Sequence, residues 1–272
     1  MTQRRNPWAA SCPATTSTTA RKKNALRPWA VGVWLLVWQG ASMAFRAALP
    51  HGGLLLPSPL SALSRLFELA GTAAFWQAVG NSTAHIFGGF LLSCALAVVL
   101  AAAAARLPAV RELLYPLVAA VKAVPVVSFV ILALVWLDSH TLPLFISALM
   151  VFPPVYLNVL SGIDGADRSL LEMAAVFHVP LWRRLRGIWL PAVLPYFRSA
   201  VSLSLGLCWK AGAAAEVIGL PAGTIGERLY TAKVYFQTPD LFAWTAVIVA
   251  VSVVFEKLFL RAVDTLAGKA GR

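Results

Sequence analysis

The sequence predicts an all-α integral membrane protein with about six transmembrane helices and a further helix on the cytoplasmic face. Of the 272 residues, 59% are hydrophobic and only 12% are charged, whereas a soluble domain has roughly 25% charged residues. The mean hydropathy is +0.75. Several apolar runs approach the ~20 residues that a helix needs to cross a bilayer. Most basic residues fall in segments that would lie on one side of the membrane.

The chain opens with a polar, basic segment over residues 1–27. Its composition predicts a disordered tail. The first apolar run follows, from Pro28 to about Ala48. It is longer than the apolar core of a signal peptide, about 7–15 residues, and no small-x-small cleavage site ends it. We therefore expect an uncleaved first span, and residues 28–272 form one membrane domain.

Five further spans are predicted at 84–105, 114–137, 141–160, 188–208 and 241–260. Between the first two spans, Ser58 precedes Pro59, which is a typical helix start. An apolar stripe follows at Leu60, Leu63, Leu66, Phe67 and Ala70. This pattern predicts an amphipathic helix lying on the outer membrane surface.

The distribution of basic residues predicts the orientation. With the N-terminus inside, the inner segments hold 16 of the 23 Lys and Arg residues: six in the tail, two in 106–112, four in 161–187 and four from Lys257 onward. Cytoplasmic segments of membrane proteins carry such an excess. Both termini are therefore expected in the cytoplasm, and residues 210–240 outside.

The long inner loop, residues 161–191, carries its own helical pattern. Ser169 and Glu172 form an S-x-x-E capping box, which predicts a short helix over 170–177. Val179 precedes Pro180, and this pair predicts a kink followed by a second helix. The first helix is largely apolar, with Leu170, Leu171, Ala174, Ala175 and Phe177. An exposed apolar helix implies a partner that covers it.

This loop resembles that of permeases of binding-protein-dependent ABC importers. Their signature is E-A-A, then Gly four residues after the second Ala, then I-x-L-P after nine more. Met173 replaces the first Ala, and His178 stands where the family has Gly. Because His is enriched at positive φ among non-Gly residues, we expect the kink to survive. The matching residues are Glu172, Ala174, Ile188, Leu190 and Pro191.

Other segments resemble the nitrate/sulfonate/taurine branch of that family. The outer link Asp138-Ser139-His140 departs from it, because the branch has a longer turn there. The similar segments are Leu56-Pro57-Ser58-Pro59, Asn81-Ser82-Thr83, Gly88-Gly89-Phe90, Lys122-Ala123-Val124-Pro125, Arg198, Trp209 with Glu216, and Gly223-Thr224-Ile225-Gly226.

The resemblance implies an ABC importer permease fold in a bacterial cytoplasmic membrane, with the loop 161–187 as the coupling loop. It implies two cytoplasmic ATPase subunits, a second permease copy (a homodimer), an extracytoplasmic solute-binding protein and membrane lipid as partners. The branch carries nitrate, sulfonates, taurine, bicarbonate and thiamine precursors, and specificity resides largely in the binding protein. The residues expected to couple to the ATPase are Ser169, Leu170, Leu171, Glu172, Ala174, Ala175, Phe177 and His178.

Polar residues and prolines in the spans give candidate pathway or gate residues: Lys122, Pro125, Arg198 and Glu216. Basic groups in lipid usually face a cavity or a partner, which would suit an anion pathway. Alternatively, Lys122 and Arg198 snorkel from the inner ends of their spans, and we favour this interpretation. Glu216 is a candidate partner of Lys210. Pro125 is either a hinge or a fixed bend.

Other functional classes are less well supported by the residues. A passive channel or scaffold without ATPase coupling would not need the exposed apolar inner helix. Gly80-Asn81-Ser82 near His85 is a weak match to an intramembrane serine protease. No phosphate-binding Gly-rich loop, metal spacing or redox spacing occurs, so we expect neither an enzyme nor a cofactor or metal. The net charge of +12 follows the positive-inside pattern, so no nucleic acid is expected.

Overall fold

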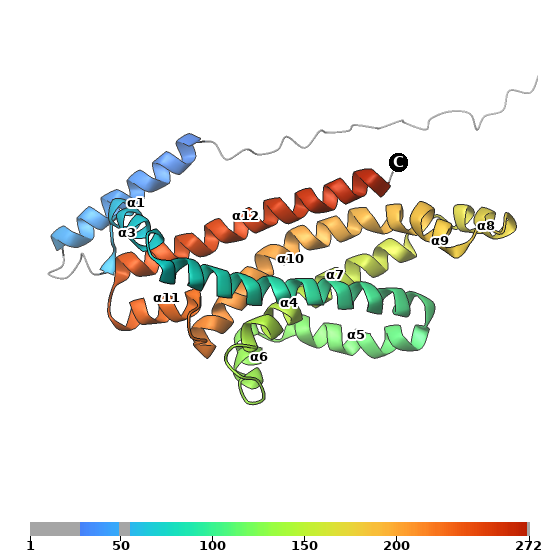
Figure 1. Cartoon of the computed structure of the whole chain (residues 1–272), viewed down its shortest axis with the longest axis horizontal. Coiled ribbons are helices and arrows are strands. Elements are labelled where there is room, and N and C mark those ends of the chain that lie inside the picture. The colour runs from blue at the N-terminus through green and yellow to red at the C-terminus, as the bar shows by residue number, and fades with distance from the viewer. Residues whose placement is uncertain (1–27, 49–54, 271–272) are drawn as a thin grey trace, which may run out of the picture.

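The computed structural model describes residues 28–48 and 55–270, and this part of the chain is helical without a strand (Figure 1). The tail predicted over 1–27 lies outside the described residues. The all-α class is confirmed. The helices are α1 (Pro28–Ala48), α3 (Pro59–Ala70), α4 (Ala73–Arg106), α5 (Pro108–Ala123), α6 (Val126–Ala133), α7 (Leu142–Asp164), α8 (Arg168–Val176), α9 (Leu181–Arg184), a π-helical turn (Leu185–Trp189), α10 (Leu190–Gly219), α11 (Ile225–Val234) and α12 (Thr238–Ala270).

The long helices α4, α7, α10 and α12 run along the long axis of the molecule (Figure 1). The pair α8–α9 lies at one end of this bundle, and α1, α3 and α11 lie at the other end. Helix α7 packs between α4 and α10. The core formed there is apolar and fully buried, and it includes Ile86, Phe90, Val151, Val155, Leu205 and Trp209.

Two glycines let α7 approach its neighbours closely. A Cβ on Gly89 of α4 would lie 2.2 Å from the Leu144 carbonyl oxygen, and one on Gly212 of α10 would lie 2.5 Å from the Ser147 hydroxyl. Membrane helices that pack on small residues gain van der Waals contact between their backbones. The three-helix core therefore depends on having no side chain at these positions.

Three helical segments are long and apolar enough to cross a membrane: α4, α7 and the continuous segment from Leu181 to Gly219. The bent pair of α5 and α6 would be a fourth. Helices α1 and α12 occupy the predicted first and sixth spans. The count of six crossings stays a prediction.

The predicted third span, 114–137, is wrong as a single helix. Helix α5 ends at Ala123, α6 begins at Val126, and their axes differ by 106°. Val124 between them is extended, with φ −82° and ψ 134°. Pro125 explains the break, because it has no N–H to donate and its ring disfavours the α conformation of the residue before it.

The helix predicted after Ser58 is confirmed. The Ser58 hydroxyl accepts a hydrogen bond from the Ser61 N–H at 3.2 Å and caps α3. Arg65 of α3 donates to Asp240 at the start of α12 at 2.6 Å, which ties the two helices together. Leu60, Leu63 and Phe67 of the predicted stripe are exposed, as expected of an amphipathic helix that meets lipid.

Candidate functional site

The predicted coupling helix exists as α8 at one end of the bundle (Figure 1). It begins at Arg168 because Asp167, and not Ser169, is its N-cap. The Asp167 carboxylate accepts from the Ser169 N–H and from the Ser169 hydroxyl, both at 2.8 Å. These bonds stabilise the ionised form and lower the pKa of Asp167. The predicted Ser169–Glu172 capping box is therefore wrong, since the Ser169 hydroxyl donates to the cap.

The predicted coupling residues fall on two sides of α8. Ala174 is only 3% exposed, and Leu171 is half-buried, so both face their own chain. Ser169, Leu170, Glu172, Ala175, Phe177 and His178 are exposed.

The exposed apolar side chains of α8 also include Met173 and Val176, which were not predicted from the sequence. Their three-residue spacing from Leu170 was the signal that could have found them. The stripe continues past the kink in Leu181 and Trp182 of α9, which are also exposed.

The kink after α8 is fixed by hydrogen bonds that close the helix end. His178 has φ 49°, in the left-handed region, so the prediction for this position is confirmed. The His178 N–H donates to the Ala175 carbonyl at 3.1 Å, and the Val179 N–H donates to the Ala174 carbonyl at 3.0 Å. This is the Schellman arrangement that glycine usually makes. Arg184 of α9 then donates to the Val179 carbonyl at 2.6 Å, which fixes the second helix against the turn.

Lys122 and Pro125, two candidate pathway residues, lie together at the break between α5 and α6. Lys122 is in the last turn of α5 and lines a cavity of about 630 Å³ between α5 and α7. Fourteen residues separate it from Pro108 at the start of α5, which corresponds to roughly 21 Å along the axis. Lys122 therefore lies toward the end of α5 that is farther from Pro108, and whether it snorkels or faces a pathway stays a prediction.

Arg198, the second candidate cation, is paired with an acid. Its Nη2 donates to Asp264 of α12 at 2.9 Å, and its Nε donates to the other oxygen of the same carboxylate. Such a two-point pair fixes the geometry of the guanidinium. Arg198 does not line the cavity that contains Lys122.

Glu216, the fourth candidate, is completely buried near the end of α10. Its Oε2 accepts from the Ser82 hydroxyl at 2.7 Å and from the Gly226 N–H at 3.1 Å. The predicted pair with Lys210 is wrong within the described part of the chain, where Lys210 is exposed and forms no ion pair. Six helical residues turn the two side chains roughly 120° apart around α10.

The Glu216 carboxylate belongs to a polar network that holds the N-terminus of α11. Ser82 accepts from the Ile225 N–H at 2.9 Å, and the Asn81 amide donates to the Gly223 carbonyl at 2.9 Å. In the sequence these segments are separate points of resemblance, far apart along the chain. The structure brings α4, α10 and the turn before α11 into one cluster.

Two side-chain hydrogen bonds, similar to a capping box, fix the start of α11 within this network. The Thr224 hydroxyl accepts from the Glu227 N–H at 3.3 Å, and the Glu227 carboxylate accepts from the Gly223 N–H at 2.6 Å. This T-x-x-E pattern was readable in the sequence and predicts a helix start. Gly223 has φ 71°, a conformation that L-residues rarely adopt.

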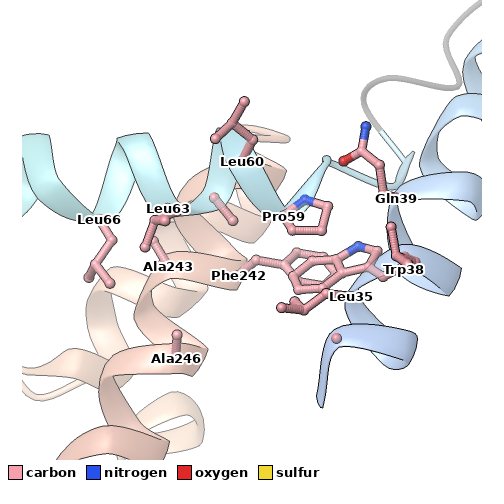
Figure 2. A pocket seen from close by; sticks show the side chains of 13 residues that line it. Leu35, Trp38, Gln39, Pro59, Leu60, Leu63, Leu66, Phe242, Ala243 and Ala246 are labelled. Carbon is pink, nitrogen blue, oxygen red and sulfur yellow. The ribbon is translucent and has the colours of Figure 1, made fainter. Parts of the chain in front are cut away.

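A second cavity, of about 710 Å³, lies between α1, α3 and α12 (Figure 2). The rings of Trp38 and Phe242 are 5.3 Å apart beside Pro59. The Trp38 indole N–H donates to the Pro57 carbonyl at 3.1 Å, which joins α1 to the segment before α3. Among the described residues that line this cavity none is charged, so it is unsuited to a charged solute.

Comparison with known proteins gives the family. The profile of the family described as "Binding-protein-dependent transport system inner membrane component" matches residues 66–269. A putative aliphatic sulfonates transport permease of Bacillus subtilis is 27% identical over 249 residues, covering 86% of each chain. The riboflavin transport system permease of Chloroflexus aurantiacus is 26% identical over 203 residues, covering 74% of this chain and 75% of that protein. The taurine transport system permease of Escherichia coli is 26% identical over 217 residues, covering 78% of each.

A solved structure has a similar fold. It is the crystal structure of a bacterial alginate ABC transporter in complex with an alginate pentasaccharide-bound periplasmic protein. The matched chain has a TM-score of 0.52 and 16% identity, covering 90% of this chain and 95% of that chain. The expected resemblance to ABC importer permeases is confirmed, including the branch of sulfonate and taurine permeases. The relatives are transport permeases and not enzymes. The chain is a multi-pass inner membrane protein that belongs to the family of inner membrane components of binding-protein-dependent transport systems, the permeases of ABC importers.

Proposed function

We propose that this permease moves a small organic solute inward across a bacterial cytoplasmic membrane, driven by two ATPase subunits that bind α8. The observation that carries the coupling is the exposed apolar stripe at the end of the bundle: Leu170, Met173, Val176, Phe177, Leu181 and Trp182. A nine-residue helix is marginal on its own in water. Covering each large apolar side chain completely would contribute roughly 1.5–3 kcal/mol. A protein partner at this end therefore stabilises both the helix and the assembly.

The shape of the segment supports transmission of movement. The closing hydrogen bonds after α8 and the Arg184 contact hold α8 and α9 at a fixed angle. Helix α9 continues through the π-helical turn into α10. Together they form one continuous helical segment from Leu181 to Gly219, which runs from this end into the bundle. A displacement of α8 by an ATPase subunit would therefore move α10 directly.

The orientation that we propose places α8 and both termini in the cytoplasm and α11 outside. It rests on the excess of basic residues in the segments assigned to the inside. Arg168, Arg183, Arg184 and Arg186 flank the α8–α9 end. The opposite orientation would put these four cations and α8 on the side without ATP.

A second copy of the chain completes the pathway in this proposal. Two copies related by a two-fold axis can enclose a route across the membrane between them. Two copies also present two α8 helices, one for each ATPase subunit. ATP binding would open the pathway outward to an external solute-binding protein, and hydrolysis would reset it.

The solute that we propose is an aliphatic sulfonate or a taurine-like molecule. The support is that the relatives from Bacillus subtilis and Escherichia coli are named as aliphatic sulfonates and taurine transport permeases. The relative from Chloroflexus aurantiacus is named as a riboflavin transport system permease. The test should therefore include riboflavin as a competing solute.

Co-purification of the ATPase with permease variants tests the coupling. Phe177→Asp places a charge on the exposed stripe at a side chain that is 74% exposed. Tyr235→Asp is the matched control, because Tyr235 is 70% exposed at the opposite end, after α11. We expect Phe177→Asp to insert and to pair with itself, yet to lose the ATPase and ATP-driven uptake. Tyr235→Asp should retain the ATPase. Normal ATPase retention by Phe177→Asp would remove the basis of the proposal, and ATP-independent flux would favour a passive channel.

A further inference from the structure

The cavity between α5 and α7 differs from the apolar cavity of Figure 2 in its polar groups. It has a volume of about 630 Å³, and two cationic side chains, Arg111 and Lys122, line it. The Tyr115 and Tyr156 side chains also belong to its wall. The rest of the lining is apolar, with Val118 and Leu160 among its members. Such a cavity offers hydrogen-bond donors and positive charge beside an apolar surface.

One face of α5 supplies most of this wall. Arg111, Tyr115, Val118 and Lys122 are spaced by four, three and four residues, which places them in one row along the helix. Eleven residues at 1.5 Å each put Arg111 and Lys122 roughly 16 Å apart along the axis. The cavity thus has one cation toward each end of an elongated groove, and the break at Pro125 ends the row.

The charges in the groove are incompletely balanced. Arg111 donates to Asp164 at 2.6 Å through one of its five N–H groups. Within residues 28–48 and 55–270, Lys122 forms neither an ion pair nor a hydrogen bond. An ionisable group within a membrane helix is costly unless it faces a cavity or a partner. The groove therefore has an uncompensated positive charge at the Lys122 end.

Tyr156 adds an independent observation. It is 2% exposed, and its hydroxyl has no hydrogen-bond partner in the described part of the chain. Buried hydroxyls are normally satisfied, because an unpaired one loses its hydrogen bonds to water without replacement. Its ring stacks on Phe152 with centroids 5.6 Å apart, an arrangement that phenylalanine would make equally well. The Tyr156 residue thus contributes to the cavity wall a hydroxyl that its own chain leaves unsatisfied.

We propose that this groove binds the oxyanion group of an amphiphilic organic anion, with the Lys122 ammonium as counter-charge and the Tyr156 hydroxyl as donor. Lys and Arg side chains donate hydrogen bonds and accept none, which favours a sulfonate, carboxylate or phosphate group. The apolar wall and the tyrosine rings fit the organic part of such a molecule. Two sources carry this chemistry: a transported organic anion, which rests on the proposed function, and the headgroup of an anionic lipid, which does not.

Equilibrium binding to the complete transporter tests the site. The wild-type permease with its ATPase subunits is placed in nanodiscs of phosphatidylcholine and titrated with radiolabelled 1-butanesulfonate. We expect saturable binding that Lys122→Gln and Tyr156→Phe each weaken by roughly tenfold or more. Tyr230→Phe, the same chemical change in α11 at the far end, should alter binding less than twofold.

Thermal unfolding separates a ligand contact from a structural role. Because the Tyr156 hydroxyl has no internal partner, Tyr156→Phe should unfold at the same temperature as the wild type or above it. A lower unfolding temperature for this variant with unchanged butanesulfonate binding would assign the hydroxyl to the fold and overturn the proposal.

A second set of nanodiscs, with phosphatidylglycerol as an additional lipid, distinguishes the two sources. Butanesulfonate binding that is unaffected by phosphatidylglycerol supports a transported anion. Loss of binding with phosphatidylglycerol, relieved in Lys122→Gln and accompanied by retention of this lipid in native mass spectra, supports a headgroup site. The proposal is overturned if the wild type neither binds butanesulfonate nor retains phosphatidylglycerol specifically. ATP-driven uptake that persists in that case would leave the proposed import function standing.

Discussion

The Ser82 hydroxyl donates to the Glu216 carboxylate at 2.7 Å, although 134 residues separate them in the sequence. Both side chains are completely buried. The same hydroxyl accepts from the Ile225 N–H at 2.9 Å, so one serine joins α4, α10 and α11. The helix α11 that it holds lies at the end of the bundle opposite α8 (Figure 1). In the proposed orientation, this cluster lies toward the outer face.

Ser82→Ala should destabilise the fold more than an ordinary serine replacement. It leaves the Ile225 N–H without its acceptor and removes one donor from a buried carboxylate. An unsatisfied buried group costs about 1–3 kcal/mol. Ser93→Ala is the control, because Ser93 is buried on the same helix and its hydroxyl has no partner in the described part. Thermal unfolding in detergent should show a lower midpoint for Ser82→Ala and nearly none of that shift for Ser93→Ala. Equal shifts would show that the network contributes nothing beyond burial.

Gly226→Ala should displace α11 from α10. A Cβ on Gly226 would lie 2.2 Å from the Glu216 Cβ and 2.6 Å from the Glu216 carbonyl carbon. Since one of these atoms is helix backbone, the conflict cannot be relieved by a side-chain rotation. Hydrogen–deuterium exchange over 225–234 should be faster in the variant. Gly206→Ala in α10, where a Cβ meets no atom within 4 Å, should leave that exchange unchanged. Unaltered exchange in Gly226→Ala would mean that α11 packs less tightly than the structure indicates.

The parts of the fold that depend on local chemistry could be predicted from the sequence. Ser58 before Pro59 predicts α3 because the cap and the proline act within one turn. His178 and Pro180 predict the kink after α8 for the same reason. The cap of α8 was misassigned because Asp167 and Ser169 are both good N-cap residues. Pattern alone does not decide which of them caps the helix.

The parts that depend on contacts between distant segments could not be predicted. The partner of Glu216 comes from α4 and α11, and no spacing in the sequence relates these positions. The burial of Ala174 follows from how α8 lies on its own chain. The 106° bend was underestimated because proline signals a break without setting its angle. Lys122 lies beside a cavity at this bend, and the sequence alone does not indicate that position.

His178→Gly should preserve the coupling segment, and His178→Val should disrupt it. At φ 49° glycine has no steric penalty, whereas an L-residue in the left-handed conformation costs roughly 1–2 kcal/mol and a β-branched residue is least tolerated. We expect normal ATP-driven uptake with His178→Gly, and faster amide exchange across α8 with reduced uptake in His178→Val. Ala175→Val adds the same side chain at an exposed helical position of α8, where it should matter much less. If both valine variants behave alike, the left-handed turn is not what holds α8.

Swapping the charges of Arg198 and Asp264 should restore the amount of folded protein that reversing the charge of Arg198 alone lowers. The two side chains form a two-point ion pair between α10 and α12, and each is about half exposed. Arg198→Asp places two carboxylates side by side and should lower the amount of folded protein, although an exposed pair contributes only about 0–1 kcal/mol when intact. The double variant Arg198→Asp with Asp264→Arg re-forms the attraction in reverse.

Uptake measured at matched protein levels then separates two roles for Arg198. If Arg198 only joins α10 to α12, the exchanged pair should transport nearly as well as the wild type, and this is the outcome we expect. If Arg198 supplies a cation to an anion pathway, the exchanged pair should stay defective, because the positive charge has moved from α10 to α12. Arg261→Asp removes an exposed cation of α12 that has no ion pair in the described part, and it controls for the change in net charge. A defect in the exchanged pair without a defect in Arg261→Asp would therefore place Arg198 on the solute route.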